Sequence, residues 1–158
     1  MPRLAVRDAY SRFAAVAPAG GFHLLPGPRP GAAVTPFADP GAVTAVCRYD
    51  LGAGSWRLRA AADDENMMAL TFYNRTGTVF HTVGERAASG GRLDVTLGTA
   101  AQIEAIEAGD AEGAPSRDMR LTAPGPTGFV LLRAMPSSLF GLQALRERVV
   151  GVECGPGR

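Results

Sequence analysis

Glycine and proline interrupt this chain so often that long regular elements are excluded. Twenty glycines and twelve prolines are spread over 158 residues, and both residue types mark turns or end helices. Between them lie short segments in which apolar and polar residues alternate, which is the period of a strand with one buried face. The clearest is 92–97, where Leu93, Val95 and Leu97 share one side. The sequence therefore predicts a mainly β fold, an antiparallel, jelly-roll-like β-sandwich.

The same alternation predicts further strands at 46–51, 56–60, 68–72, 78–83 and 119–121. Segment 129–134 is predicted as a more fully buried strand, and 150–154 as a last short strand. The turn Gly52-Ala53-Gly54 predicts that the first two of these strands form a hairpin. Two short helices are expected among the strands. One starts at Thr99, whose spacing to Gln102 is that of a capping box, and the other is opened by Pro136.

The first forty residues differ in character from the rest. Residues 1–17 are interpreted as an N-terminal helical segment, because Tyr10, Phe13 and Val16 are spaced for one helix face. Residues 18–40 carry six prolines, which exclude a helix and predict an extended proline-rich arm over the domain surface. Residues 41–158 then form the sandwich domain.

The charged residues exclude several classes of function. Sixteen arginines balance fifteen acidic residues, and a formal charge of +1 is too even for a protein that binds nucleic acid. The absence of lysine removes phosphate-binding lysines, pyridoxal Schiff bases and lysine nucleophiles. Two histidines and two cysteines are too few for a zinc finger, so we expect no metal site and no cofactor. No apolar run is long enough to span a membrane.

No catalytic set emerges from the sequence, and three residues are the candidates for ligand binding. Asp64 belongs to a run of carboxylates between two predicted strands. His81 shares a predicted strand face with two valines, and Tyr73 is one of several aromatic residues at strand spacing. A cleft lined by His81, Tyr73 and Asp64 would hold a small molecule. The alternative for each is structural: a solvated hairpin tip for Asp64, and core positions for His81 and Tyr73.

The two cysteines, Cys47 and Cys154, both fall on inward strand positions. If they face each other, a disulfide would close a loop of more than a hundred residues and stabilise the fold by about 4–5 kcal/mol. Alternatively, they are two buried thiols that act as small hydrophobic side chains. The sequence leaves both open, because the outcome depends on whether the compartment is oxidising.

Several short segments together resemble a known bacterial family. They are 45–51 (AVCRYDL), 70–77 (LTFYNRTG), 84–87 (GERA) and 130–134 (VLLRA). The chain is similar to short, single-domain membrane-protein members of the domain-of-unknown-function family twelve-fifty-four. Such proteins carry one N-terminal membrane helix, and the chain begins where that helix would end. The resemblance implies a domain on the periplasmic side of the inner membrane and no particular activity.

These observations together predict an envelope domain that binds rather than catalyses. Titratable side chains fall mainly at turns and outward positions, where solvated charges belong. We expect a non-catalytic binding or structural module that contacts an envelope protein through its sheet face or proline-rich arm. Contact with the membrane is expected only through the missing upstream helix. The alternative is a small-molecule-binding or hydrolytic domain that uses a cleft near His81 and Asp64.

Overall fold

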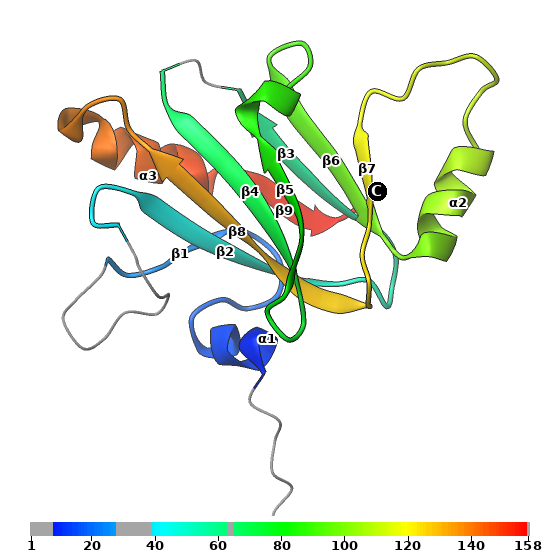
Figure 1. Cartoon of the computed structure of the whole chain (residues 1–158), viewed down its shortest axis with the longest axis horizontal. Helices are drawn as coiled ribbons and strands as arrows, with labels where there is room; N and C mark the ends of the chain where they lie inside the picture. The colour runs from blue at the N-terminus through cyan, green and yellow to red at the C-terminus, as the bar shows by residue number, and fades with distance from the viewer. Residues whose placement is uncertain (1–7, 28–38, 63–64, 158) are drawn as a thin grey trace, which may run out of the picture.

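The strands of the protein form two sheets, as a computed structural model that describes residues 8–27, 39–62 and 65–157 shows (Figure 1). The five-stranded sheet has the order β1 (His23–Leu24), β2 (Val43–Asp50), β8 (Thr127–Met135), β4 (Met67–Asn74) and β5 (Val79–Gly84). The four-stranded sheet has the order β7 (Met119–Thr122), β6 (Arg92–Gly98), β3 (Trp56–Ala61) and β9 (Glu153–Pro156). The helices are α1 (Ala9–Arg12), α2 (Ala100–Ala108) and α3 (Leu142–Val150), and the 3₁₀ turns are η1 (Phe13–Ala15), η2 (Glu85–Ala87) and η3 (Leu139–Gly141). The prediction of a mainly β fold is confirmed.

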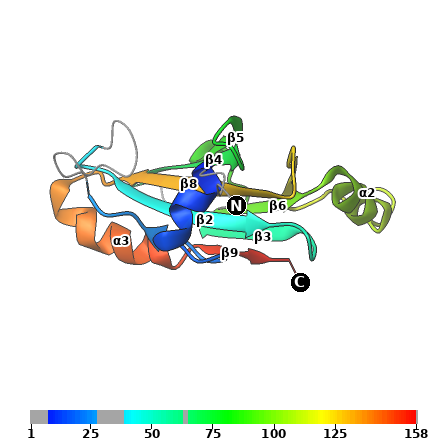
Figure 2. The same ribbon diagram turned by 90° about the horizontal axis from the view of Figure 1, so that it is seen from below.

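The two sheets lie in separate layers and share one apolar core (Figure 2). Alternation along the strands sends Leu70 and Leu132 inward from the five-stranded sheet. Leu58 and Val95 point inward from the four-stranded sheet and meet the same core. Burying these faces against each other removes apolar surface from water, which is the main stabilising contribution in such a fold.

The predicted hairpin at Gly52-Ala53-Gly54 is wrong, because β2 and β3 belong to different sheets. The chain leaves β2 at Asp50, crosses between the layers and begins β3 at Trp56. The indole Nε1 of Trp56 donates a hydrogen bond to the carbonyl oxygen of Asp50 (2.7 Å) and ties the two strand ends together. Both strands have an apolar face, and placing these faces opposite each other buries them both.

The four-stranded sheet is mixed rather than purely antiparallel, since β6 and β7 run parallel. A parallel pair needs a crossover connection, and α2 supplies it. The predicted capping box is present: the Thr99 hydroxyl accepts from the backbone N–H of Gln102, and the Gln102 side chain accepts from the backbone N–H of Thr99. Ile103 is the buried residue of this helix. The crossover therefore adds one parallel pair to a fold whose other described strand pairs are antiparallel.

The N-terminal helix is shorter than predicted. α1 starts after Asp8, whose carboxylate accepts a hydrogen bond from the backbone N–H of Ser11 (2.8 Å), and the chain continues as η1. Of the predicted proline-rich arm, residues 18–27 include β1, which pairs with β2. Residues 28–38 of that arm, like residues 1–7, lie outside the described residues.

The last strand begins later than predicted. Residues 142–150 form α3, because Leu145 and Val149 lie one helical turn apart and both enter the core. Gly151 caps the helix, and β9 starts at Glu153.

Near its start, strand β8 has a glycine at a position where the neighbouring strands leave no room for a side chain. Gly128 pairs with Tyr49 on β2 and with Asn74 on β4. Because Gly128 has no side chain, the Tyr49 ring crosses over it, and the Tyr49 hydroxyl donates to the carbonyl oxygen of Tyr73 (2.9 Å). Burial raises the pKa of Tyr49, which keeps this donor protonated. A Cβ atom at residue 128 would overlap both the Tyr49 hydroxyl and the Tyr73 carbonyl.

Gly128→Ala should therefore lower the free energy of unfolding by about 2–3 kcal/mol, because the added methyl group overpacks a closed site. Chemical denaturation measures this loss. Gly125→Ala is the matched control, since a Cβ at residue 125 would meet no atom within 4 Å. An equal loss of stability in the two variants would contradict the crossing of Tyr49 over Gly128.

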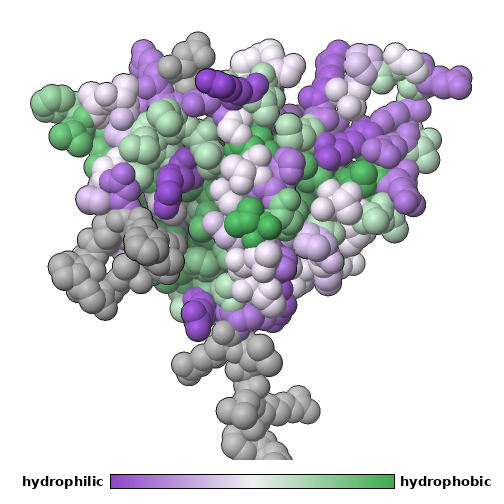
Figure 3. All heavy atoms as spheres, viewed as in Figure 1, coloured by the Kyte–Doolittle hydropathy of each residue, from purple (hydrophilic) through white to green (hydrophobic). Residues whose placement is uncertain are grey.

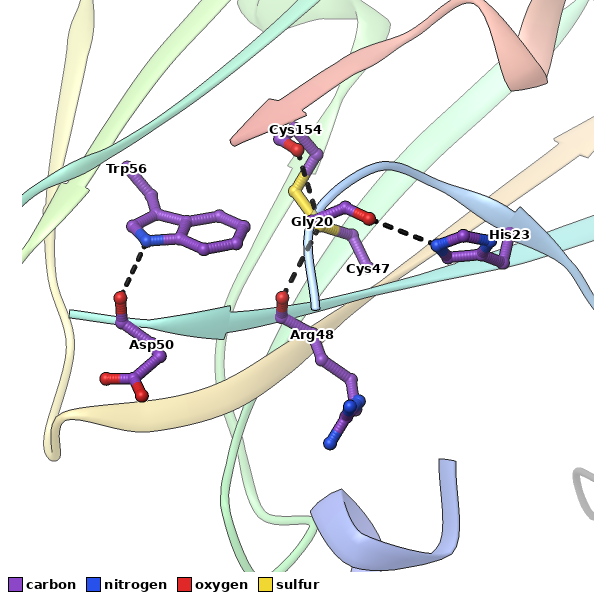
Figure 4. Close-up of a disulfide and its surroundings, with 7 residues drawn as sticks. All are labelled: Gly20, His23, Cys47, Arg48, Asp50, Trp56 and Cys154. Carbon is purple, nitrogen blue, oxygen red and sulfur yellow. Dashed lines mark hydrogen bonds between the residues drawn. A yellow bond between two sulfur atoms is a disulfide. The ribbon is translucent and has the colours of Figure 1, made fainter. Parts of the chain in front are cut away.

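A disulfide links the two sheets at one side of the core (Figure 4). Cys47 on β2 and Cys154 on β9 are bonded, with their Cα atoms 6.6 Å apart, so the structure has the bridge rather than two thiols. The N-terminal segment passes beside it. The backbone N–H of Gly20 donates to the carbonyl of Arg48 (3.3 Å), and that of Gly21 donates to the carbonyl of Cys154 (2.7 Å). Both glycines have a positive φ, 83° and 74°, a conformation that glycine adopts without strain.

Removing this bridge should cost much of the stability of the fold. The bridge joins residues separated by 107 positions, for which the loop-entropy model gives about 4–5 kcal/mol. Adding a reductant should lower the free energy of unfolding of the wild type by that amount, as measured by denaturant titration. The double variant Cys47→Ala, Cys154→Ala should be equally unstable with and without reductant. A wild type that is insensitive to full reduction would refute the expected contribution.

Candidate binding groove

The outer face of the five-stranded sheet carries ordered pairs of side chains. Because strand residues alternate between faces, residues on β4 and β8 that do not enter the core face outward. Along the two strands these outward pairs are Tyr73 with Phe129, Thr71 with Leu131 and Ala69 with Arg133. The rings of the first pair are stacked, with centroids 4.8 Å apart and planes 8° from parallel. The row thus runs from aromatic side chains at one end to a cation at the other.

The N-terminal segment covers the aromatic end of this row. Phe13 of η1 packs against Phe129, with ring centroids 4.9 Å apart. Phe13, Ala17, Val46 and Phe129 form a second, smaller apolar cluster on this side of the sheet. The cluster shields the outward aromatic residues from water, as the inner face is shielded by the other sheet.

Two arginines fasten this cover to the sheet. The Nε of Arg48 donates to the carbonyl oxygen of Ala17 (2.7 Å), and its guanidinium lies 4.7 Å from the centroid of the Tyr10 ring. Arg75 forms an ion pair with Asp8 and lies 4.8 Å from the same ring. Arginine over an aromatic face is an attractive cation–π contact, so Tyr10 is held by one cation from β2 and one from the turn after β4.

Beyond the covered end, the outer face is hollowed into an open groove of about 540 Å³, which we call the outer groove. This volume lies in the range of small-molecule sites. Figure 3 shows this face, with an apolar depression and hydrophilic side chains around it. The residues that line the outer groove are Ala9, Arg12, Phe13, Thr44, Ala69, Thr71, Tyr73, Thr76, Gly77, Phe129, Leu131 and Arg133.

The outer groove offers positive charge that no described residue neutralises. The side chains of Arg12 and Arg133 are exposed, and neither makes a hydrogen bond or an ion pair with another described residue. Thr44 lies beside Arg133 in the strand register. Its hydroxyl and that of Thr71 are also without a hydrogen-bond partner among the described side chains and backbone groups. Guanidinium and hydroxyl groups in this state can donate hydrogen bonds to an anion.

The outer face of the other sheet has a different character, because most of its arginines face carboxylates. Arg57 donates two hydrogen bonds to Asp94 (2.9 and 2.8 Å), and Arg59 lies 3.5 Å from the same carboxylate. Hydrogen bonding from Arg57 holds the pKa of Asp94 below its ordinary value. Farther along, Arg120 lies 3.5 Å from Asp118. Arg120 also donates two hydrogen bonds to Asp110 (2.5 and 3.1 Å), so these pairs neutralise the charges of the three arginines.

The structure does not bring the three predicted ligand residues together. Tyr73 lines the outer groove. His81 pairs with Phe72 on β4, its ring centroid is 6.4 Å from that of Phe72, and its side chain is exposed. Because Phe72 and Tyr73 are consecutive strand residues, His81 and Tyr73 lie on opposite faces of the sheet. Asp64 lies outside the described residues.

Three residues of the outer groove were missed by the sequence analysis. Segment 129–134 is predicted only as a more fully buried strand, so neither Phe129 nor Arg133 is proposed as a site residue. The available signal is that Arg133 falls four residues after Phe129, on the same face of an otherwise apolar strand. Nothing in the pattern points to Arg12, because only the docking of η1 places it at the groove.

Neither a metal centre nor a membrane span is seen in the described part of the chain. Over residues 8–27, 39–62 and 65–157, no three side chains of histidine, cysteine, aspartate or glutamate gather to hold a metal ion. Within the same ranges, no helix is long and apolar enough to cross a membrane.

Comparison with known proteins shows a shared fold. By sequence, the chain matches no family model and no curated protein. The crystal structure of the VPA0106 protein from Vibrio parahaemolyticus is similar, with a TM-score of 0.64 at 10% identity over 94% of this chain and 34% of that one. An uncharacterized protein from Burkholderia cenocepacia has a TM-score of 0.44 at 14% identity, over 73% of this chain and 31% of that one. The chain therefore spans about a third of the VPA0106 chain, and the likeness to VPA0106 concerns the fold alone.

Acid should loosen α1 from the outer face. Hydrogen bonds from Ser11 hold the pKa of the Asp8 carboxyl below its ordinary value, and Arg75 lowers it further. A lowered pKa means that Asp8 supports docking fully above the pKa of a free carboxyl, and that this support is lost as the pH falls through the docked value. The NMR shift of the Ser11 amide should therefore move toward that of an unstructured chain below about pH 4.

Asp8→Asn removes the titrating group, so its Ser11 amide shift should not titrate over the same range. A wild-type Ser11 shift that stays constant down to about pH 2, below the pKa of most paired carboxyls, would contradict the role of Asp8.

Proposed function

We propose that this protein is a non-catalytic binding module and that its ligand occupies the outer groove. The observation that carries the proposal is an apolar groove with two exposed arginines that no described residue neutralises. Ligand sites typically combine an apolar lining with a few polar groups that fix orientation. Here Tyr73 and Leu131, which are partly exposed, supply apolar surface, and Arg12 and Arg133 supply the polar contacts.

The lining supports binding rather than catalysis. Its described residues include neither a histidine nor a carboxylate, which are the groups that most often transfer protons in enzymes. Its hydroxyls come from threonines and Tyr73, and no described base faces them from within the lining.

We also propose that the domain faces the periplasm and belongs to the family that it resembles, family twelve-fifty-four. The disulfide between Cys47 and Cys154 supports this location, because disulfides persist in oxidising compartments. The resemblance implies attachment through an apolar helix upstream of Met1 and an envelope protein or small molecule as the partner. Thiol labelling of the protein from its own cells, quenched in acid, should find both cysteines blocked, and two free thiols would refute the location.

For the fold, we infer that the two sheets are the layers of a β-sandwich related to the jelly roll. The shared core and the five antiparallel strands of one sheet support this. The β6–α2–β7 crossover then takes the place of one antiparallel connection.

A neutral fluorescent probe tests whether the outer groove binds at all. N-phenylnaphthylamine becomes fluorescent in apolar sites and carries no charge, so it should bind the wild type at one site. Thr71→Trp places a large ring on the middle pair of the groove floor and should abolish this binding while circular dichroism stays unchanged. Thr122→Trp makes the same change at an exposed position of the other sheet and should bind as the wild type does. Probe binding that survives Thr71→Trp would overturn the proposed function.

A further inference from the structure

We infer that the ligand of the outer groove is a linear molecule with an apolar chain and one terminal carboxylate, and that the carboxylate lies at Arg133. This inference rests on the proposed function and specifies the ligand class for the same groove.

The strand register sets the direction of the ligand. Phe129, Leu131 and Arg133 are successive outward residues of β8, so the floor changes from apolar to cationic over about 14 Å, at about 3.4 Å per residue. Across from them on β4 lie Tyr73, Thr71 and Ala69. Phe13 buries Phe129, so an apolar chain laid along this row contacts Tyr73 and Leu131 at one end and brings its head group to Arg133 at the other.

The small side chains at the cationic end leave room for a head group. Ala69 and Thr44 flank Arg133 on the two neighbouring strands, and both are smaller than the aromatic residues at the other end. The guanidinium presents paired N–H donors that match the two oxygens of a carboxylate. The free hydroxyl of Thr44 adds one further donor beside it.

The chemistry of this end favours a carboxylate over a cation or a neutral head. An ammonium group would meet a like charge at Arg133, and no described carboxylate lines the groove to offset it. A neutral alcohol would leave the arginine without a counter-ion. Arg12 also lines the groove, but it directly precedes Phe13 at the aromatic end, where it adds a general attraction for anions rather than the head-group contact.

The inference is tested by comparing three ligands of equal chain length. Decanoate, decanol and decylamine, each below its micelle concentration, are titrated into the wild-type protein by calorimetry. Decanoate should bind about tenfold more tightly than decanol, because its carboxylate adds a hydrogen bond between charged groups. Decylamine should bind most weakly.

Three glutamine variants locate the head group. Arg133→Gln should weaken decanoate about tenfold or more and leave decanol unchanged. Arg12→Gln should weaken decanoate by at most about fivefold, as expected for one exposed ion pair. Arg92→Gln is the control, because Arg92 is exposed on β6 of the other sheet and should change nothing.

The outcomes separate this inference from the proposed function. Equal binding of the three ligands, no binding of decanoate by a protein that still binds the neutral probe, or a larger effect of Arg12→Gln than of Arg133→Gln would overturn the inference and leave the groove as a binding site. Dimers in solution that Thr71→Trp dissociates, together with no decanoate binding, would identify a second copy as the occupant and also overturn it. If the wild type did not bind the neutral probe, or if Thr71→Trp still bound it, the proposed function itself would be overturned.

Discussion

Strand β8 is apolar on both of its faces, and keeping water from both sides of it is the constraint that organises this protein. Its inward residues Val130, Leu132 and Ala134 are buried by the four-stranded sheet. Its outward residue Phe129 is buried by a different element, the N-terminal segment through Phe13. That segment is short and covers only the first outward pair, Tyr73 with Phe129. The outer groove is the part of the same face that the segment leaves open, so the site follows from incomplete burial of a two-faced strand.

The route of the N-terminal segment is set by contacts that also close the side of the core. Arg48 takes part twice, because its side chain binds the carbonyl of Ala17 and its own carbonyl accepts from Gly20. One residue later, Gly21 binds the carbonyl of Cys154 beside the disulfide. The cover over the outer face and the link between the two sheets are therefore joined in sequence and in space. We therefore expect that breaking the bridge between β2 and β9 also displaces the N-terminal segment that lines the outer groove.

The arginines on the two outer faces differ in whether a carboxylate neutralises their charge, and their neighbours determine this difference. Arg59 pairs with Asp94 in the register of β3 and β6, and Arg57 donates to the same carboxylate, so both charges are neutralised in place. Arg133 has Ala69 and Thr44 as its cross-strand neighbours, which offer no opposite charge. In a chain whose basic residues are all arginine, composition says nothing about this difference. Only the strand pairing shows which cations are available to a ligand.

The sequence by itself determined the local elements, because alternation, caps and turns act over a few neighbouring residues. The strand at 92–97 and the capping box at Thr99 both appear where the pattern places them. The tertiary structure alone decided how those elements pair. Whether 46–51 and 56–60 form a hairpin or face each other across a core depends on which arrangement buries two apolar faces, and that is a property of the whole chain. The outer groove was undetermined for the same reason, since Arg12, Phe129 and Arg133 meet only after η1 has docked on a sheet built from distant strands.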